Sequence, residues 1–137
     1  MNSEVLSTVN AMSANTLVSH LGIIFTKLED GYAEATMPVD SRTHQPFKIL
    51  HGGASVALAE TLGSVGANFS IDNSQYTTVG VEINCNHLRS KSNGIVTGKA
   101  TRIHNGRKIQ VWSIEIVDEL GKLIATSRMS TMVIPKS

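Results

Sequence analysis

The chain has 137 residues, of which 41% are hydrophobic, and a formal net charge of +1. This length suits one domain, since domains commonly run about 100 to 200 residues, and its Lys and Arg are too dispersed to form the basic surface that nucleic-acid binding requires. We therefore predict a single domain over residues 1–137 with no nucleic-acid partner.

The N-terminal region contains no apolar run of the kind that directs secretion or membrane insertion, which predicts a cytoplasmic protein without a membrane partner. A lone cysteine excludes an internal disulfide. Cys85 follows Val79, Val81 and Ile83 at strand period, and this pattern favours a buried thiol over a nucleophile or a metal ligand.

The first elements are two predicted helical segments and a hairpin. Residues Ser3 to Met12 have apolar side chains at helical spacing, and Asn15 is a candidate cap for a second short turn that ends near Gly22. Two strands, Ile23 to Leu28 and Tyr32 to Met37, then flank Asp30-Gly31, a hairpin signal.

A polar loop leads into a long helix of small residues. Pro46 bars a helix within the loop, so the helix begins near Gly52 and Gly53, whose N–H groups have no partner inside the helix. These donors can bind an oxygen that gains negative charge. Further along, Gly63 and Gly66 each cost about 1 kcal/mol of intrinsic helicity, which predicts compensation by close packing and a mostly buried helix.

Four more strands follow the helix, separated by turns, in the pattern of an antiparallel meander. They are predicted at Thr77 to His87, Ile95 to Ile103, Lys108 to Val117 and Lys122 to Ile134. The order ββαββββ, preceded by an N-terminal helix, predicts an α+β fold. One helix cannot cover both faces of six strands, so the other face should meet a partner.

Glu60 is the main candidate for chemistry. A carboxylate on a buried helix is costly unless it is paired or its pKa rises, and Ser64 lies one turn further along. One interpretation places Glu60 at an exposed edge with no role, and the other places it in a cleft shared with the loop. Ser64 does not lie in a G-x-S-x-G elbow, which argues against a serine hydrolase.

Several short motifs occur along the chain: Met37-Pro38-Val39-Asp40, Arg42-Thr43, Gln45-Pro46-Phe47, Leu50-His51-Gly52-Gly53, Leu58-Ala59-Glu60, Gly63-Ser64, Asn84, Asn86-His87 and Gln110-Val111-Trp112. Together, from about Ser19 to Val133, they resemble the hotdog-fold acyl-CoA thioesterases, in the PaaI-like branch with the proofreading thioesterase of enterobactin synthesis and 1,4-dihydroxy-2-naphthoyl-CoA thioesterase. Two departures are Lys48, where close relatives usually have Gly, and Cys85, where they usually have Ala.

The resemblance implies a hotdog fold, an antiparallel sheet wrapped around one central helix. It implies hydrolysis of acyl or aroyl thioesters of coenzyme A, or of a carrier protein, to free acid and thiol. Glu60 would act as nucleophile or general base, Gly52 and Gln45 would polarise the carbonyl, Ser64 would hold the water and His51 the thioester. Substrate binding would involve Gly53, Gly80, His87, Leu88, Arg89, Ser90, His104, Asn105, Gly106, Arg107 and Lys108.

No cofactor is expected, because thioester hydrolysis is downhill and coenzyme A belongs to the substrate. The family forms homodimers that pair into homotetramers, with each active site at a dimer interface. Related enzymes favour aromatic acyl groups, although others in the branch accept straight chains.

Several of these residues can also have purely structural roles or no role in the site. His51 can simply brace the turn, His87 can lack a role, the basic residues at strand ends can be merely solvated, and Trp112 fits core packing better than an aryl platform. The five histidines show no close ligand pair, so we expect no metal site.

Two other functions stay open. A hotdog dehydratase or hydratase would use His and a carboxylate, but related dehydratases have a longer, proline-rich spacer than His51 to Glu60. A non-catalytic acyl-CoA-binding module would dispense with Glu60 and would normally carry a DNA-binding segment, for which we expect no room in the first 20 residues.

Overall fold

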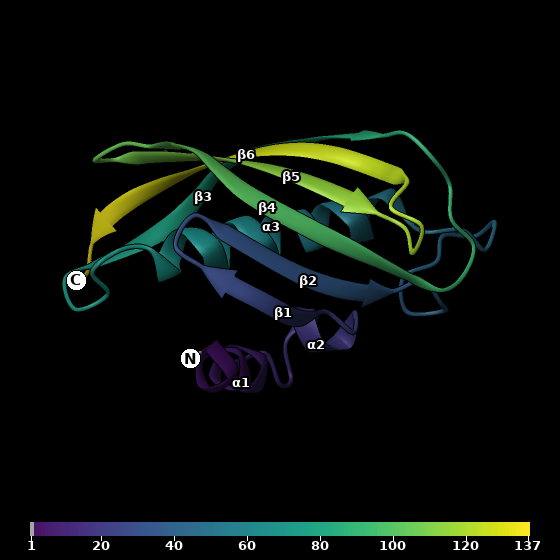
Figure 1. Ribbon diagram of the computed structural model, residues 1–137, viewed down its shortest axis with the longest axis horizontal. Coiled ribbons are helices and arrows are strands. Elements are labelled where there is room, and N and C mark those ends of the chain that lie inside the picture. Colours follow the sequence, from purple (N-terminus) through teal and green to yellow (C-terminus); the bar gives the residue numbers. More distant parts are fainter. Residues whose placement is uncertain (1) are drawn as a thin grey trace.

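A six-stranded antiparallel sheet wraps around one long helix in the computed structural model, which describes residues 2–137 (Figure 1). The predicted α+β class and the ββαββββ order are confirmed. The helices are α1 (Asn2–Met12), α2 (Leu17–His20) and α3 (Gly52–Phe69), and the strands are β1 (Ile24–Glu29), β2 (Tyr32–Pro38), β3 (Tyr76–His87), β4 (Ile95–Asn105), β5 (Ile109–Val117) and β6 (Leu123–Pro135).

The strand order in space is β1-β2-β4-β5-β6-β3, so the four-strand meander predicted after the helix is wrong in one respect. Strands β4, β5 and β6 form a meander, whereas β3 pairs with β6 in a register that runs from Tyr76↔Pro135 to His87↔Ala125. The alternation of apolar and polar side chains predicts where each strand lies in the sequence, but it does not predict which other strand it pairs with. As a consequence β1 and β3 are the two edges of the sheet.

Glycines allow α3 to lie close to the sheet, as the sequence predicted. A Cβ at Gly66 would lie 2.8 Å from Cη2 of Trp112, and a Cβ at Gly63 would lie 2.5 Å from Sδ of Met129. Trp112 is fully buried and donates its Nε1–H to Oε1 of Gln110 at 2.9 Å, which confirms it as a core residue. Packing against the sheet therefore compensates for the weak helix propensity of these glycines.

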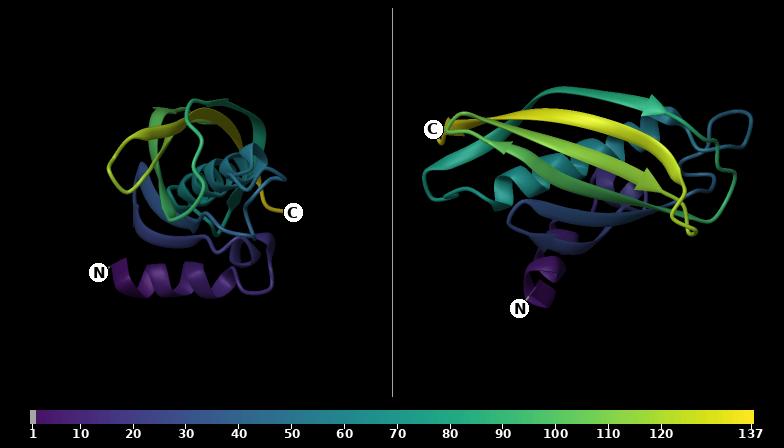
Figure 2. Two further views of the ribbon diagram at one scale, coloured as in Figure 1. Left: turned by 90° about the vertical axis from the view of Figure 1, so that its right-hand side faces the viewer. Right: turned by 45° about the horizontal axis from the view of Figure 1, so that its top comes forward.

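Only one face of α3 is buried, so the expectation of a mostly buried helix is wrong. The sheet, which curves around α3 in both views of Figure 2, leaves the opposite face only partly covered. That face carries half-exposed Val56, Ala57, Glu60 and Ser64. The buried residues are Ala54, Ser55, Leu58, Ala59, Leu62, Gly63, Gly66 and Ala67.

The N-terminal helix α1 packs beside the edge strand β1. The Asn10 amide accepts from Phe25 N–H at 2.8 Å and donates to Phe25 O at 3.0 Å, which satisfies backbone groups at the sheet edge. Thr16, not Asn15, caps α2, because the Thr16 side chain accepts from Val18 N–H; Asn15 instead has a left-handed backbone with φ 62°. Met12, predicted on the apolar face of the helix, is 76% exposed.

Across residues 2–137, we find no helix whose length and apolar character would let it cross a membrane.

Candidate active site

The start of α3 is capped by the residue that precedes it. The Nδ1 atom of His51 accepts from Gly53 N–H at 2.7 Å, and His51 N–H donates to Thr43 O at 2.8 Å. The Gly53 N–H is thus occupied, and the expectation that both glycines offer free donors is wrong for this one. No acceptor lies within bonding distance of Gly52 N–H in the described part of the chain, so Gly52 is the donor left for a ligand.

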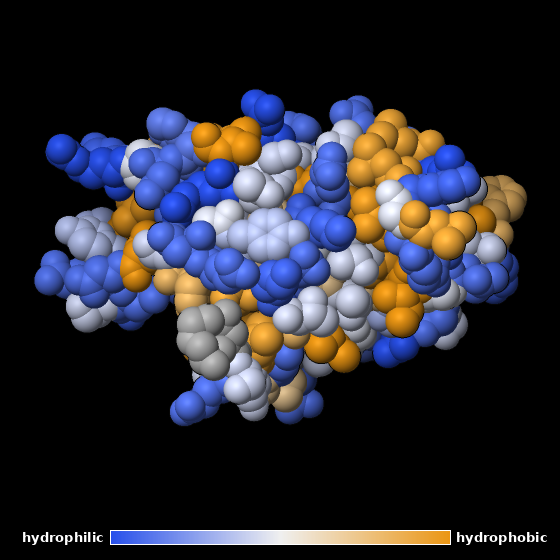
Figure 3. All heavy atoms as spheres, in the orientation of Figure 1, coloured by the Kyte–Doolittle hydropathy of each residue, from blue (hydrophilic) through white to orange (hydrophobic). Residues whose placement is uncertain are grey.

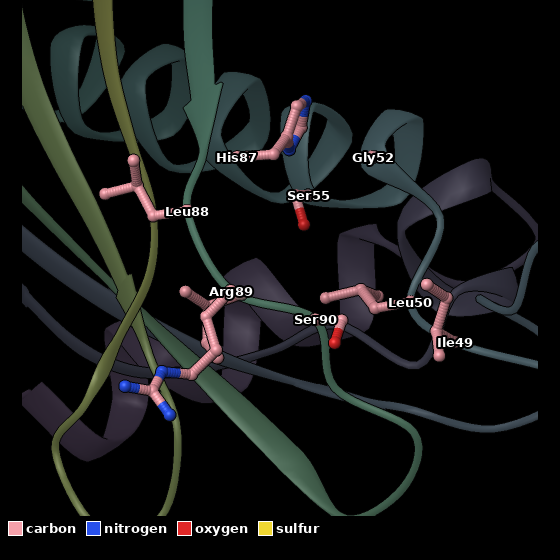
Figure 4. Close-up of a pocket in the computed structure, with 9 residues that line it drawn as sticks. Ile49, Leu50, Gly52, Ser55, His87, Leu88, Arg89 and Ser90 are labelled. Atoms are coloured by element: carbon pink, nitrogen blue, oxygen red, sulfur yellow. The ribbon is translucent and has the colours of Figure 1, made fainter.

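The ring of His87 covers Gly52. A Cβ at Gly52 would lie 3.0 Å from both Cε1 and Nε2 of His87, so a larger residue would push the ring away. The two residues border a cavity of about 270 Å³, shown in Figure 4. Its lining consists of Ile49, Leu50, Gly52, Ser55, His87, Leu88, Arg89, Ser90 and Ile124. The structure therefore brings Gly52 together with the predicted binding segment from His87 to Ser90.

Ser55 was missed by the sequence reasoning. It is only 2% exposed, and its side chain projects from α3 toward the segment with Arg89 and Ser90 (Figure 4). Its spacing of three residues from Gly52 places both on one face of the helix, which was the available signal. The Arg89 guanidinium points away from Gly52.

The loop before α3 is folded tightly around Gln45. Its Oε1 accepts from Phe47 N–H, and its backbone N–H donates to Ile49 O at 2.8 Å. Because the amide oxygen is occupied, the amide NH₂ of Gln45 is the part left to donate. Lys48, which donates its N–H to Gln45 O, has a left-handed backbone with φ 64°, a conformation that favours glycine.

Glu60 lies on the open side of α3, with its carboxylate against Gly80 of β3. A Cβ at Gly80 would lie 2.5 Å from Oε2 of Glu60. Within residues 2–137, Glu60 makes no ion pair and its side chain makes no hydrogen bond. One turn further on, Ser64 lines a groove of about 610 Å³ between α1, α3 and the start of β3, whose lining is half apolar, with Val9, Val65 and Phe69 among its residues.

Two groups of predicted site residues lie far apart within one chain. Gly52 and Glu60 are separated by about 12 Å along the axis of α3, at 1.5 Å per residue, so they cannot reach one carbonyl together. The expected cleft shared by Glu60 and the Gly53 end is therefore wrong for a single chain.

The turn from His104 to Lys108 lies at the opposite end of the sheet from His87. On β6, His87 pairs with Ala125, whereas Lys108 O accepts from Val133 N–H. The separation is about 26 Å at 3.3 Å per residue. One chain does not bring this turn together with the cavity.

Cys85 packs against the edge of the core and is only partly buried, not fully buried as predicted. It is half-buried, and its Sγ lies 3.9 Å from Nδ1 of His87. Burial raises the pKa of the thiol. The predicted alternation fails for Val79 and Val81, which are 42% and 56% exposed, because a bulge at Gly80 to Glu82 interrupts the strand next to an open edge.

The surface near the cavity is apolar. Figure 3 shows apolar side chains most extensively at the end of the molecule where α3 begins. The segments at this end carry exposed Phe47, Leu88, Ile95 and Leu120. In the part of the chain that the structure covers, no three His, Cys, Asp or Glu side chains gather closely enough to hold a metal ion.

Comparison with known proteins identifies the family of the chain. Residues 47–125 match the model of the Thioesterase superfamily. The chain is 51% identical over 129 residues to the proofreading thioesterase EntH of Klebsiella pneumoniae, covering 94% of this chain and 93% of the relative.

Comparison with solved structures also identifies thioesterases. A thioesterase of Haemophilus influenzae superposes with a TM-score of 0.91 at 49% identity, covering 95% of this chain and 90% of the other. A glutamine-to-alanine variant of a Pseudomonas aeruginosa thioesterase gives 0.93 at 46% identity, covering 96% and 94%. The fold is the hotdog fold, and the chain belongs to the Thioesterase superfamily as a thioester hydrolase.

Proposed function

We propose that this thioesterase hydrolyses acyl or aroyl thioesters of coenzyme A, or of a carrier protein's phosphopantetheine, with Glu60 as nucleophile or general base. The observation that carries the proposal is a half-exposed carboxylate with no partner among the described residues, held against a glycine backbone. A carboxylate in this state is available to attack a carbonyl or to take a proton from water.

The carbonyl of the substrate would bind at the start of α3. The free Gly52 N–H and the amide NH₂ of Gln45 are donors that suit an oxygen gaining negative charge, and each such donor lowers a barrier by about 3 to 4 kcal/mol. Ser64 would hold the attacking water one turn from Glu60. His51 would fix the turn at the start of α3 by capping it, and it would also hold the thioester.

The complete site would combine two chains. Glu60 and Gly52 lie too far apart on one helix, but Glu60 points to β3, an open sheet edge along which a second chain can pair. A symmetric pairing sets the two copies of α3 antiparallel, so that the Gly52 end of one helix approaches the Glu60 half of the other. The same pairing would supply His104 to Lys108 to the partner's cavity.

The central test measures thiol release from acyl-CoA. We expect Glu60→Ala and Glu60→Gln to lower kcat at least about 100-fold with the fold intact. Glu82→Gln is the matched control, because Glu82 is an exposed carboxylate on the same strand as Gly80. Near-wild-type turnover in either Glu60 variant would exclude the proposed role.

Mixing two inactive variants tests the shared site. Glu60→Ala and Gly52→Val chains, unfolded and refolded together, form mixed dimers in which one of the two sites has both residues intact. We expect recovery of about a quarter of wild-type activity from statistical mixing. A mixture as inactive as its components would exclude a site that combines Gly52 of one chain with Glu60 of another. Light scattering should show an assembly larger than one chain, and we expect a tetramer of two dimers.

The acyl preference is the most specific part of the proposal. His87 and Gln45 offer polar groups that can recognise a ring hydroxyl, and a site with unpaired polar groups disfavours plain alkyl chains. We expect a higher kcat/KM for hydroxybenzoyl-CoA than for decanoyl-CoA, and a smaller difference in His87→Ala. A clear preference for decanoyl-CoA would remove the aromatic assignment and leave the thioesterase assignment intact.

A further inference from the structure

One wall of the cavity is a connecting segment, residues 88–94, that bonds to several other parts of the molecule. At its start, the N–H groups of Leu88 and Arg89 donate to Ile124 O at 2.8 and 3.2 Å. In its middle, Lys91 O accepts from Leu50 N–H at 2.8 Å. Lys91 is therefore one of two points, with Ser92, where the wall meets the loop that leads to Gly52.

The side chain of Lys91 fixes this wall to the turn between β5 and β6. Its Nζ lies 2.7 Å from Oε1 of Glu119, and the side chains of Lys91 and Glu119 are 15% and 50% exposed. The other carboxylate oxygen of Glu119 accepts from Ile95 N–H at 2.8 Å. Glu119 thus contacts the segment in its middle, at Lys91, and just beyond its end at Gly94.

The lack of a side chain at Gly94 makes room for the Glu119 carboxylate. Its φ is +84°, and a Cβ there would lie 2.1 Å from Oε2 of Glu119. The carboxylate occupies the space that any side chain at position 94 would need. The hydrogen bond from Lys91, followed by the one from Ile95 N–H and with a smaller effect of the Lys91 charge, lowers the pKa of Glu119 to about 2.

We infer that Glu119 is a positioning residue for substrate binding: through Lys91 it holds Arg89 and Ser90 in place to receive the coenzyme A part of the thioester. This inference rests on the proposed function. Without the ion pair the wall would gain freedom, and the substrate would have to order it on binding. The consequence is weaker binding of the thiol portion, with little effect on the chemical step at Glu60.

Glu119→Gln tests the inference, because the amide oxygen still accepts from Ile95 N–H while the charge is lost. Asp30→Asn is the matched control. Asp30 Oδ1 lies 2.9 Å from Nη1 of Arg102, whose side chain is also 15% exposed, and this pair lies at the hairpin between β1 and β2, away from the cavity.

The readout is KM and kcat for one acyl group on coenzyme A and on N-acetylcysteamine, which lacks the nucleotide. We expect Glu119→Gln to raise KM for the coenzyme A thioester about fivefold, the effect of losing one ion pair, with kcat within about twofold. The KM of Glu119→Gln for the truncated thioester should be unchanged. Asp30→Asn should leave the KM for both thioesters unchanged. Lys91→Met should raise the KM for the coenzyme A thioester by the same factor as Glu119→Gln. The KM of the double variant should be no higher than that of either single variant.

Unchanged KM in Glu119→Gln, or an equal rise for the truncated thioester, would overturn the inference while leaving the proposed function intact. Absence of turnover by the wild-type protein would overturn the proposed function, and with it the inference.

Discussion

The carboxylate of Glu60 occupies the space beside Gly80 that a side chain on β3 would fill, with Oε2 only 2.5 Å from the position of a Cβ. The bulge between Gly80 and Glu82 lies at the same place. The backbone of an edge strand, rather than another side chain, therefore sets where this carboxylate lies.

Replacing Gly80 tests that relationship. Gly80→Ala should displace the end of the Glu60 side chain and lower kcat at least about tenfold, since a shift of about 1 Å in a reacting group can cost as much as 100-fold. Stability should change little, because a flexible side chain can move. The measurements are kcat and the urea midpoint, with Val79→Ala as the control on the same strand. Unchanged kcat would show that Gly80 does not position Glu60.

Lys48 adopts a backbone conformation that suits glycine. Lys48→Gly should raise the free energy of unfolding by about 0.5 to 1 kcal/mol, because the left-handed region costs an ordinary residue about 1 to 2 kcal/mol and the entropy of glycine offsets part of that gain. Asn15→Gly at φ 62° is the control, with a smaller expected gain since Asn tolerates this conformation. Urea titration measures both variants. Loss of stability in Lys48→Gly would show that other contacts of Lys48 outweigh the strain.

Gly66→Ala should destabilise the protein although Ala is the better helix former. Its Cβ would lie 2.8 Å from a fully buried Trp112 ring that has no room to retreat. We expect a loss of about 1 to 3 kcal/mol, the usual range for overpacking. Trp112 is the sole tryptophan, so its fluorescence reports unfolding directly. Thr61→Ala, on the open face of α3, should stay within about 0.5 kcal/mol.

Acid should remove the contribution of the ion pair at Glu119. Its pKa is lowered from 4.5 to about 2, so the stabilisation is present above pH 4.5 and is lost as the pH falls toward 2. Glu119→Gln should therefore be less stable than wild type at pH 7, and the two urea midpoints should converge between pH 4.5 and 2. A difference that stays constant over this range would assign the loss to packing rather than to charge.

Local chemistry predicted most of the fold. Alternating side chains and turn residues placed every strand within two residues, and Pro46 with Gly52 located the start of α3. The small residues of α3 indicated its close approach to the sheet. These features depend on the chain within a few residues of each position.

Contacts between distant parts of the chain were not predictable in this way. The pairing of β3 with β6, the place of Ser55 in the cavity and the ion pair of Lys91 with Glu119 all depend on how elements meet in space. The same limit on prediction from sequence applies to the candidate site. Spacing identified Gly52 and Glu60, but only the rise of α3 shows that one chain holds them too far apart to act together.

The bond between Asn10 and Phe25 also limits how the sheet can grow. With β1 blocked by α1, β3 is the one free edge within residues 2–137. Two chains that paired along β3 would form a continuous sheet whose outer margins are both covered by α1. Such pairing would stop at two copies, so the arrangement that leaves one edge open would also limit edge-to-edge growth into fibrils.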